Sequence, residues 1–239
     1  MKKTIFKQGD ALIVFTYGKT SNKKIATATE TIVQTYSFSR GQFDEARKQA
    51  TTMRDFFSQD KPVCGDCPFA VNNGAKLTAC YTHKLMQYSG FLSSLRSIAK
   101  AYESFDAIPE LTEEIAKQIL GGAQGRYVRF GSYGEPSLIP IDLVENIVKV
   151  AKSHTGYTHQ WKRKPEYAPY FMASVHTSEQ EREAHASGWR SFVASKEVIK
   201  GLVNCPASNE QGFKSNCSKC GLCSGAQGKG NKSVVILEH

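Results

Sequence analysis

Long hydrophobic runs are missing from this sequence of 239 residues. No stretch approaches the roughly 18 consecutive apolar residues of a membrane-spanning helix. The opening residues MKKTIFKQGD are basic and contain no apolar core of a secretory signal peptide. We therefore expect a soluble protein in the cytoplasm, with no membrane partner.

Several common catalytic motifs are also missing. The sequence has no P-loop, no G-x-S-x-G elbow and no dinucleotide-binding fingerprint, which argues against an NTPase, a serine hydrolase and a Rossmann dehydrogenase. The composition, 40% hydrophobic and 22% charged, is ordinary for a globular protein with a sizeable core. The net charge of +9 comes from scattered Lys and Arg residues. It indicates a mildly basic surface, and nucleic acid or an anionic substrate is the alternative partner.

The first half of the chain predicts a β-hairpin followed by helices. ALIVFTYG and IATATETIVQTYSFS alternate as antiparallel strands do, with the polar turn KTSNKK between them. Helical spacing of apolar residues follows over 41–58, 81–105 and 109–120. A loop rich in Pro, Gly and Asn, residues 59–80, separates the first two helices and contains three cysteines.

After residue 125, short apolar segments alternate with helical ones. YVRFG, TGYTHQW, YFMASVHT, WRSFVAS and the closing SVVILEH are the predicted strands. Such alternation indicates parallel βα units, so we predict an α/β fold with a partial or irregular (β/α) barrel, and an open doubly wound sheet as the alternative. We expect three segments: a hairpin and helix over 1–58, a cysteine loop and barrel-like core over 59–204, and a cysteine-rich metal segment with a closing strand over 205–239.

All seven cysteines fall into two groups. In a reducing compartment, clustered thiols indicate metal binding or catalysis rather than disulfides. In the C-terminal group, CSKCGLC places three thiols at two successive C-x2-C steps, a spacing that ferredoxins use for four-iron clusters. The first group is Cys64, Cys67 and Cys80, and the second is Cys205, Cys217, Cys220 and Cys223.

The three-plus-four division predicts one or two [4Fe-4S] clusters. Four thiolates close the coordination of a four-iron cluster, whereas three leave one iron open to a substrate or cofactor. Zinc is the alternative, because His83 two residues beyond Cys80 would complete a Cys3His site. A single metal site that takes ligands from both groups is a further alternative.

The segment GSYGEPSLIP follows the predicted strand YVRF and precedes a helix. Glycine lets a backbone approach a ligand closely, and a carboxylate such as Glu135 at a strand end can bind an ammonium group. A plain turn before a helix that starts near Pro140 is the alternative. His159, Trp161 and His176 fall near the ends of predicted strands, where they face a ligand or form part of the core or rim. Arg190 begins its strand and is predicted to be structural.

GEPSLIP resembles the GGEP segment of radical S-adenosylmethionine enzymes. The larger set ACYT, RYVRFGSYGEPSLIP, GYTHQW, FMASVHTSEQE, GWRSF and CSKCGLCSG, within residues 60–239, is similar to a family of phage-encoded proteins distantly related to that superfamily. The resemblance implies a partial (β/α) barrel, a three-cysteine cluster and a four-cysteine auxiliary cluster. It also implies that Gly134, Glu135 and Pro136 contact S-adenosylmethionine, and that the protein works in the host cytoplasm.

The spacing of the first cysteine group departs from that family. Radical S-adenosylmethionine enzymes mostly use C-x3-C-x2-C in one short loop, whereas here the pattern is C-x2-C-x12-C. Tyr133 also replaces the first glycine of the GGEP segment. The resemblance implies an enzyme that generates a 5′-deoxyadenosyl radical on an unknown substrate. The alternatives are a zinc- or iron–sulfur-stabilised module that binds nucleic acid or a host protein, and an electron-transfer protein.

Overall fold

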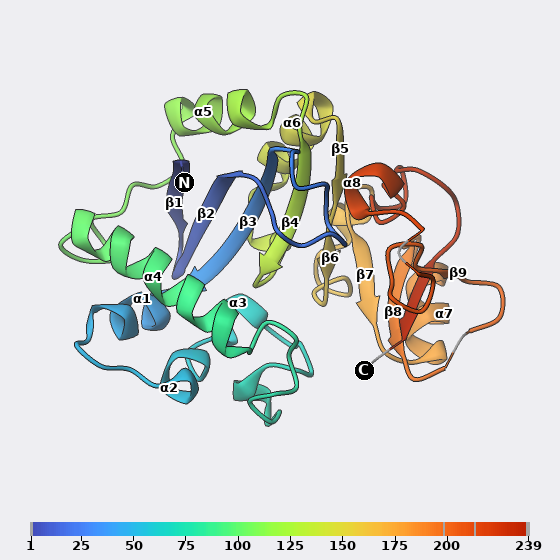
Figure 1. Cartoon of the computed structure of the whole chain (residues 1–239), viewed down its shortest axis with the longest axis horizontal. Helices are drawn as coiled ribbons and strands as arrows, with labels where there is room; N and C mark the ends of the chain where they lie inside the picture. Colours follow the sequence, from blue (N-terminus) through green and yellow to red (C-terminus); the bar gives the residue numbers. More distant parts are fainter. Residues whose placement is uncertain (1, 198, 213, 238–239) are drawn as a thin grey trace.

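The structure is a computed structural model that describes residues 2–197, 199–212 and 214–237. It is a mixed α/β protein with two five-stranded sheets and helices (Figure 1). The first sheet has the strand order β1-β2-β3-β4-β5, and the second has the order β6-β7-β8-β10-β9. The strands of the first sheet are β1 (Lys2–Gln8), β2 (Ala11–Gly18), β3 (Ile32–Ser39), β4 (Tyr127–Tyr133) and β5 (Ser153–Thr155). Those of the second are β6 (Tyr157–Thr158), β7 (Met172–Val175), β8 (Ser191–Ser195), β9 (Val203–Asn204) and β10 (Val234–Leu237).

The first sheet changes from antiparallel to parallel at β3. Strands β1, β2 and β3 are antiparallel, whereas β4 pairs in parallel with both β3 and β5. The interior strand β2 is buried along most of its length, which suits its continuous run of apolar residues. The predicted antiparallel pair at the start of the chain is therefore present, with an additional strand before it.

Two details of the predicted hairpin are wrong. Residues 2–8 form β1, which joins β2 through a tight turn at Gly9, where φ is +57°. The second predicted strand starts at Ile32 instead of Ile25. The backbone of the preceding loop bonds elsewhere, since Lys24 O and Ile25 O accept hydrogen bonds from the amides of Cys217 and Ser218. Hydrogen bonds to the C-terminal cysteine segment thus take the place of the strand pairing that the alternating residues predict.

The described helices lie around the sheets, and the predicted ones are present with shorter bounds. The segment predicted as one helix over 41–58 is broken into two, because Ser39 and Thr52 each form a capping box that starts a new helix. The α-helices are α1 (Arg40–Arg47), α2 (Met53–Phe57), α3 (Lys61–Cys64), α4 (Leu85–Ala101), α5 (Glu113–Ala123), α6 (Ile141–Val150), α7 (Ser178–Ala186) and α8 (Cys217–Cys220). Three 3-10 turns are η1 (Val71–Asn73), η2 (Pro136–Leu138) and η3 (Pro165–Tyr167).

The second sheet is entirely parallel. Strand β7 pairs with β6 and β8, and β10 lies between β8 and β9. Helix α7 connects β7 to β8, as the alternation of apolar and helical segments predicts. The four predicted strands over 155–195 and 233–239 are confirmed at their centres, although Glu238 and His239 lie outside the described residues.

One stretch of chain, residues 153–158, contributes a strand to each sheet. Strand β5 pairs with β4, and β6 pairs with β7. Gly156 lies between them: its amide donates to Cys223 O and its carbonyl accepts from Met172 N. A side chain there would meet Phe171 and Phe130, since a Cβ would lie 2.5 Å from the Phe171 ring. Glycine at this junction therefore lets the two sheets meet.

A closed barrel is not formed by the described strands, because the β1 and β9 edges do not pair with each other. One large core extends across both sheets, from Phe6 in β1 to Val235 in β10. A second, smaller core contains Cys205 and Cys223 together with Met172 and Val234. No described helix has the length and apolar character needed to cross a membrane.

Replacing Gly156 with Ala should destabilise the protein by about 1–3 kcal/mol, because the added methyl group overpacks the junction against Phe171. Denaturant unfolding measures this change. Gly90 in helix α4 is a matched control, since a Cβ there meets no atom within 4 Å. Gly90→Ala should leave stability unchanged or raise it by up to about 1 kcal/mol. Equal stabilities of the two variants would contradict this account of the junction.

Candidate functional site

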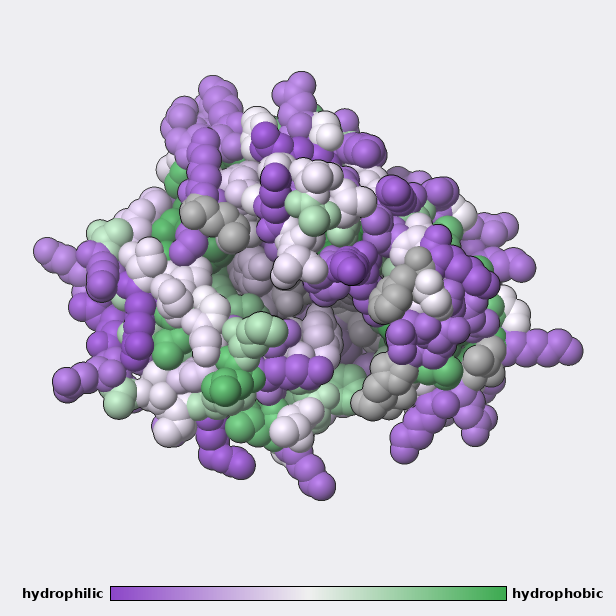
Figure 2. All heavy atoms as spheres, viewed as in Figure 1, coloured by the Kyte–Doolittle hydropathy of each residue, from purple (hydrophilic) through white to green (hydrophobic). Residues whose placement is uncertain are grey.

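A cavity of about 560 Å³ lies against one face of the parallel strands and is bordered by both cysteine groups. Residues two apart along each strand face it, as expected for one side of a sheet. Examples are Arg129, Gly131 and Tyr133 of β4, Phe192 and Ala194 of β8, and Val234 and Ile236 of β10. The surface is hollowed between the two sheets in Figure 2, with hydrophilic side chains around the outer edge. The volume is within the range of small-molecule sites.

The first cysteine group begins with Cys64 at the end of helix α3 and continues with Cys67 and Cys80 on the loop that follows. Cys67 N donates to Cys64 O, and the side chain of Asn73 donates to the carbonyls of Gly65 (2.7 Å) and Cys67 (2.9 Å). These bonds hold the C-x2-C turn in one conformation. Cys80 arrives from the far end of the loop, and its sulfur lies 3.0 Å from Thr82 Oγ1. All three thiols border the cavity.

The GSYGEP segment contacts this loop directly. Gly134 has φ of +71°, and a Cβ there would lie 2.6 Å from Ser37 O and 3.2 Å from Val63 O. Only glycine fits this close approach without strain. The amide of Glu135 then donates to Val63 O at 2.7 Å, immediately before Cys64. Gly134 and Glu135 border the cavity, whereas Pro136 begins the turn η2 behind them.

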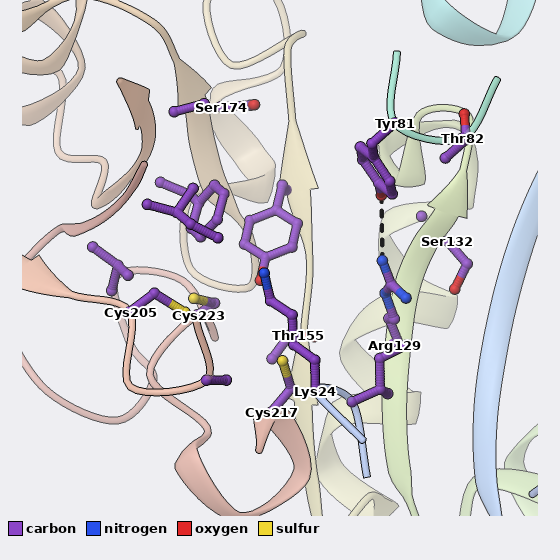
Figure 3. Close-up of a pocket in the computed structure, with 18 of the residues that line it drawn as sticks. Lys24, Tyr81, Thr82, Arg129, Ser132, Thr155, Ser174, Cys205, Cys217 and Cys223 are labelled. Carbon is purple, nitrogen blue, oxygen red and sulfur yellow. Dashed lines mark hydrogen bonds between the residues drawn. The ribbon is translucent and has the colours of Figure 1, made fainter. Parts of the chain in front are cut away.

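The second cysteine group is attached to three different parts of the fold. Cys205 N donates to Val235 O in β10, Cys217 N to Lys24 O, and Cys223 O accepts from the Gly156 amide at the sheet junction. Cys217 and Cys220 are the ends of α8, which Asn216 caps by accepting from the Lys219 amide. Figure 3 shows Cys205 and Cys223 side by side, with Cys217 nearby. All four thiols border the same cavity.

Burial, together with thiols of the same group, raises the pKa of Cys64 and of Cys223. Burial is the main cause that raises the pKa of Cys64, and Cys67 and Cys80 raise it further. Burial likewise raises the pKa of Cys223, with Cys217, Cys205 and Cys220 adding to the shift. These buried thiols are therefore neutral unless a cation or metal stabilises the thiolate. The thiols of both groups border one cavity.

The donor set is chemically suited to iron–sulfur clusters. All seven cysteines are free; Cys205 and Cys223 are buried, and the other five are half-buried. In the described part of the chain, however, no group of three or more His, Cys, Asp or Glu side chains is arranged to hold a metal ion. The cysteines therefore supply the type of ligand that a cluster needs. In the described residues, their side chains are not arranged around a common metal position.

Glu135 is the centre of a buried hydrogen-bond network. Its carboxylate accepts from Thr158 Oγ1 (2.6 Å), the His159 amide (3.0 Å) and His159 Nδ1 (3.2 Å). His159 Nε2 lies 3.2 Å from His176 Nε2, and both rings border the cavity. The predicted strand-end positions of His159 and His176 are thus brought together with Glu135. The Glu135 carboxylate therefore accepts three hydrogen bonds from its own chain.

The two histidines have opposite pKa shifts. Burial lowers the pKa of His159, but its hydrogen bonds to Cys67 and Glu135 and the charges of those groups outweigh burial and raise it to about 10. Burial and the neighbouring His159 lower the pKa of His176 to about 4. At neutral pH the network therefore holds a charged His159 between Glu135 and a neutral His176.

Three other predicted residues lie away from the cavity. His83 Nδ1 lies 3.1 Å from Leu77 O and its ring stacks on Phe57, so the ring does not join the three thiols as a Cys3His zinc site requires. Trp161 belongs to the main core. Arg190 is structural: its guanidinium donates to the carbonyls of Gly225, Lys229 and Lys232 and holds the C-terminal loop.

Sequence reasoning missed three residues that face the cavity, Lys24, Tyr81 and Arg129 (Figure 3). Arg129 lies in the middle of YVRFGSY, and a charged residue inside a parallel strand was the available signal. Lys24 had no such signal, because its loop reaches the site only through long-range bonds to the second cysteine group.

Comparison with known proteins gives no match to a family model, a curated protein or a solved structure.

Replacing Glu135 with Gln should destabilise the metal-free protein by about 3–5 kcal/mol near pH 6.5, because a buried charged pair loses one partner. The pKa of His159 is raised from 6.5 to about 10, so its contribution is fully present below pH 6.5 and is lost as pH rises towards 10. Urea unfolding across this range should show the gap between wild type and variant narrowing with pH. Thr158→Val, which removes a neutral donor, should cost about 1 kcal/mol at every pH. A gap for Glu135→Gln that does not change with pH would contradict the charged pair.

Proposed function

We propose that this protein is an iron–sulfur protein of the radical S-adenosylmethionine type with two four-iron clusters. The observation that carries the proposal is the cavity bordered by both thiol groups and by Gly134 and Glu135. Three thiols leave one iron of a cluster open, and four thiols close its coordination. The first group would hold the open cluster, and the second group would hold the closed one.

We also propose that the two sheets form one irregular, open (β/α) barrel. Residues 153–158 pass from one sheet to the other, and every neighbouring pair from β3 to β9 in the two orders is parallel. The cavity lies against the inward-facing residues of these strands. The first cysteine group is adjacent to the segment that follows the end of β4, where parallel α/β folds place their ligands.

The residues of the chain would bind and orient the cofactor. With S-adenosylmethionine bound, an open cluster reduced by an external one-electron donor would supply the electron for cleavage of the sulfonium, which would give methionine and a 5′-deoxyadenosyl radical. The Glu135 amide fixes the Cys64 turn, so the cofactor-binding segment and the open iron would keep a constant separation. The Glu135 carboxylate would act through His159 rather than on the cofactor, because its oxygens already accept three hydrogen bonds.

The second group would have a structural role. Cys205, Cys217 and Cys223 bond to β10, to the loop at Lys24 and to the sheet junction, so one cluster would join these three regions. Ligation contributes folding free energy where the unfolded chain has no preformed site. A structural cluster in the second group is also compatible with an electron-transfer protein, which is one alternative. The other alternative is a module that binds nucleic acid or a host protein and that both thiol groups stabilise by holding metal.

Anaerobically purified protein should contain about eight iron atoms and eight sulfides per chain. A variant with Ala at Cys217, Cys220 and Cys223 should keep about half of each and lose thermal stability. A variant with Ala at Cys64, Cys67 and Cys80 should also keep half. Iron and sulfide analysis and EPR of the reduced proteins measure these contents.

S-adenosylmethionine distinguishes the two clusters. It should change the EPR spectrum of the variant that retains Cys64, Cys67 and Cys80, and leave the spectrum of the other variant unchanged. Iron in both groups without any effect of the cofactor would support the electron-transfer alternative. Colourless protein with stoichiometric zinc would overturn the proposal.

A further inference from the structure

Arg129 places a cation against the cavity from the middle of β4. Its side chain is half-buried, and among the described residues its guanidinium makes one side-chain hydrogen bond, from Nη2 to the Tyr81 hydroxyl at 3.2 Å. Figure 3 shows the guanidinium directed at Tyr81 and away from Cys205 and Cys223. Four of its five N–H donors therefore have no protein partner in the described ranges.

Lys24 adds a second cation to the same cavity. Its loop is fixed, because the carbonyls of Lys24 and Ile25 accept from Cys217 N and Ser218 N. Neither Lys24 nor Arg129 forms an ion pair with a carboxylate in the part of the chain that the structure describes. Glu135 is the one described carboxylate that borders the cavity, and its oxygens are occupied by Thr158 and His159.

A guanidinium in a cavity of low polarity is costly unless an anion accompanies it. Arg presents a planar fork of donors that matches the two oxygens of a carboxylate or phosphate group. Cys217 is a partial competitor for these cations: burial raises the pKa of its thiol, and the charges of Arg129 and Lys24 oppose that shift. The guanidinium nevertheless points to the opposite side, towards the exposed rim residue Tyr81.

The walls next to these cations are largely aromatic and aliphatic. Tyr157 and Phe192 lie with their ring centroids 4.4 Å apart, and Ala194, Val234 and Ile236 continue the same surface. Such a wall suits a planar or apolar ligand body, while Arg129 would fix its charged end.

We propose that Arg129, supported by Lys24, is an oxyanion-binding subsite, and that the substrate is a small molecule with one carboxylate or phosphate on a planar or apolar body. The inference of an anion-binding site depends on the unpaired cations and the adjacent apolar wall. Only the inference that the bound anion is the substrate rests on the proposed function. Tyr81 would release the guanidinium when the anion binds.

Two pairs of probes, measured by isothermal titration calorimetry on anaerobically purified protein, test the subsite. Adenosine 5′-monophosphate is compared with adenosine, and indole-3-acetate with indole-3-acetamide. At least one anion should bind about 10- to 100-fold more tightly than its neutral analogue, as expected for charge-assisted hydrogen bonds. The pair that shows this preference distinguishes a phosphate from a carboxylate ligand.

Arg129→Met should remove the preference for the anion, and Arg129→Lys should retain part of it. Arg182→Met is the matched control, because Arg182 is exposed on α7 and the change in net charge is the same. It should leave both affinities unchanged. Lys24→Met, on a loop rather than in the sheet, tests the same preference if Arg129→Met does not fold, and it should reduce the preference several-fold.

The proposal is overturned if neither anion binds more tightly than its neutral analogue, or if the preference survives in both Arg129→Met and Lys24→Met. Iron content, measured on every preparation, separates this result from the proposed function. An anion preference in iron-free protein would leave the subsite standing and the cluster proposal refuted. Iron-loaded protein with no anion preference would refute the subsite alone.

Discussion

The buried carboxylate of Glu135 is the interaction on which the site depends. A charged group with little contact with water must be surrounded by donors, and here the donors are Thr158 and His159 from the end of β6. The Glu135 amide meanwhile bonds to Val63 O, next to the first cysteine group. One residue therefore relates the end of β4, the cysteine loop and the second sheet, so these three elements cannot shift independently.

The sequence allowed much of this architecture to be predicted. Alternating strands and helices after residue 125 are local patterns, because each apolar segment faces the same core as its neighbours, and these elements are confirmed. The loop at Ile25 was predicted as part of a strand, and this error has a different origin. Ile25 alternates like a strand residue, but its carbonyl bonds to Ser218, about 190 residues later in the chain. No local pattern contains that information, and tertiary contacts decide such segments.

The same limit applies to the candidate site. The two cysteine groups and the GSYGEP segment are recognisable because their chemistry is concentrated in short stretches. Their arrangement around one cavity depends on Gly156, where the chain passes between sheets, and on long-range bonds from Cys217 and Cys223. His83 shows that a favourable spacing does not by itself place a residue in the site. Its spacing from Cys80 fits a Cys3His zinc site, but its ring stacks on Phe57. Spacing gives the ligand types, and packing decides which of them share a site.

Charge balance explains why the cavity suits both metal clusters and anions. Burial keeps the thiols neutral in the metal-free protein, because it raises the pKa of Cys64 and of Cys223. Lys24, Arg129 and His159 then contribute positive charge, which Glu135 offsets only at His159. Lys24 places positive charge beside the second thiol group, whereas the first thiol group is beside the pair formed by Glu135 and His159. A cluster held by the second thiol group would carry negative charge that offsets the positive charge of Lys24. The guanidinium of Arg129, which points towards Tyr81, would then be available to bind the anionic group of a ligand.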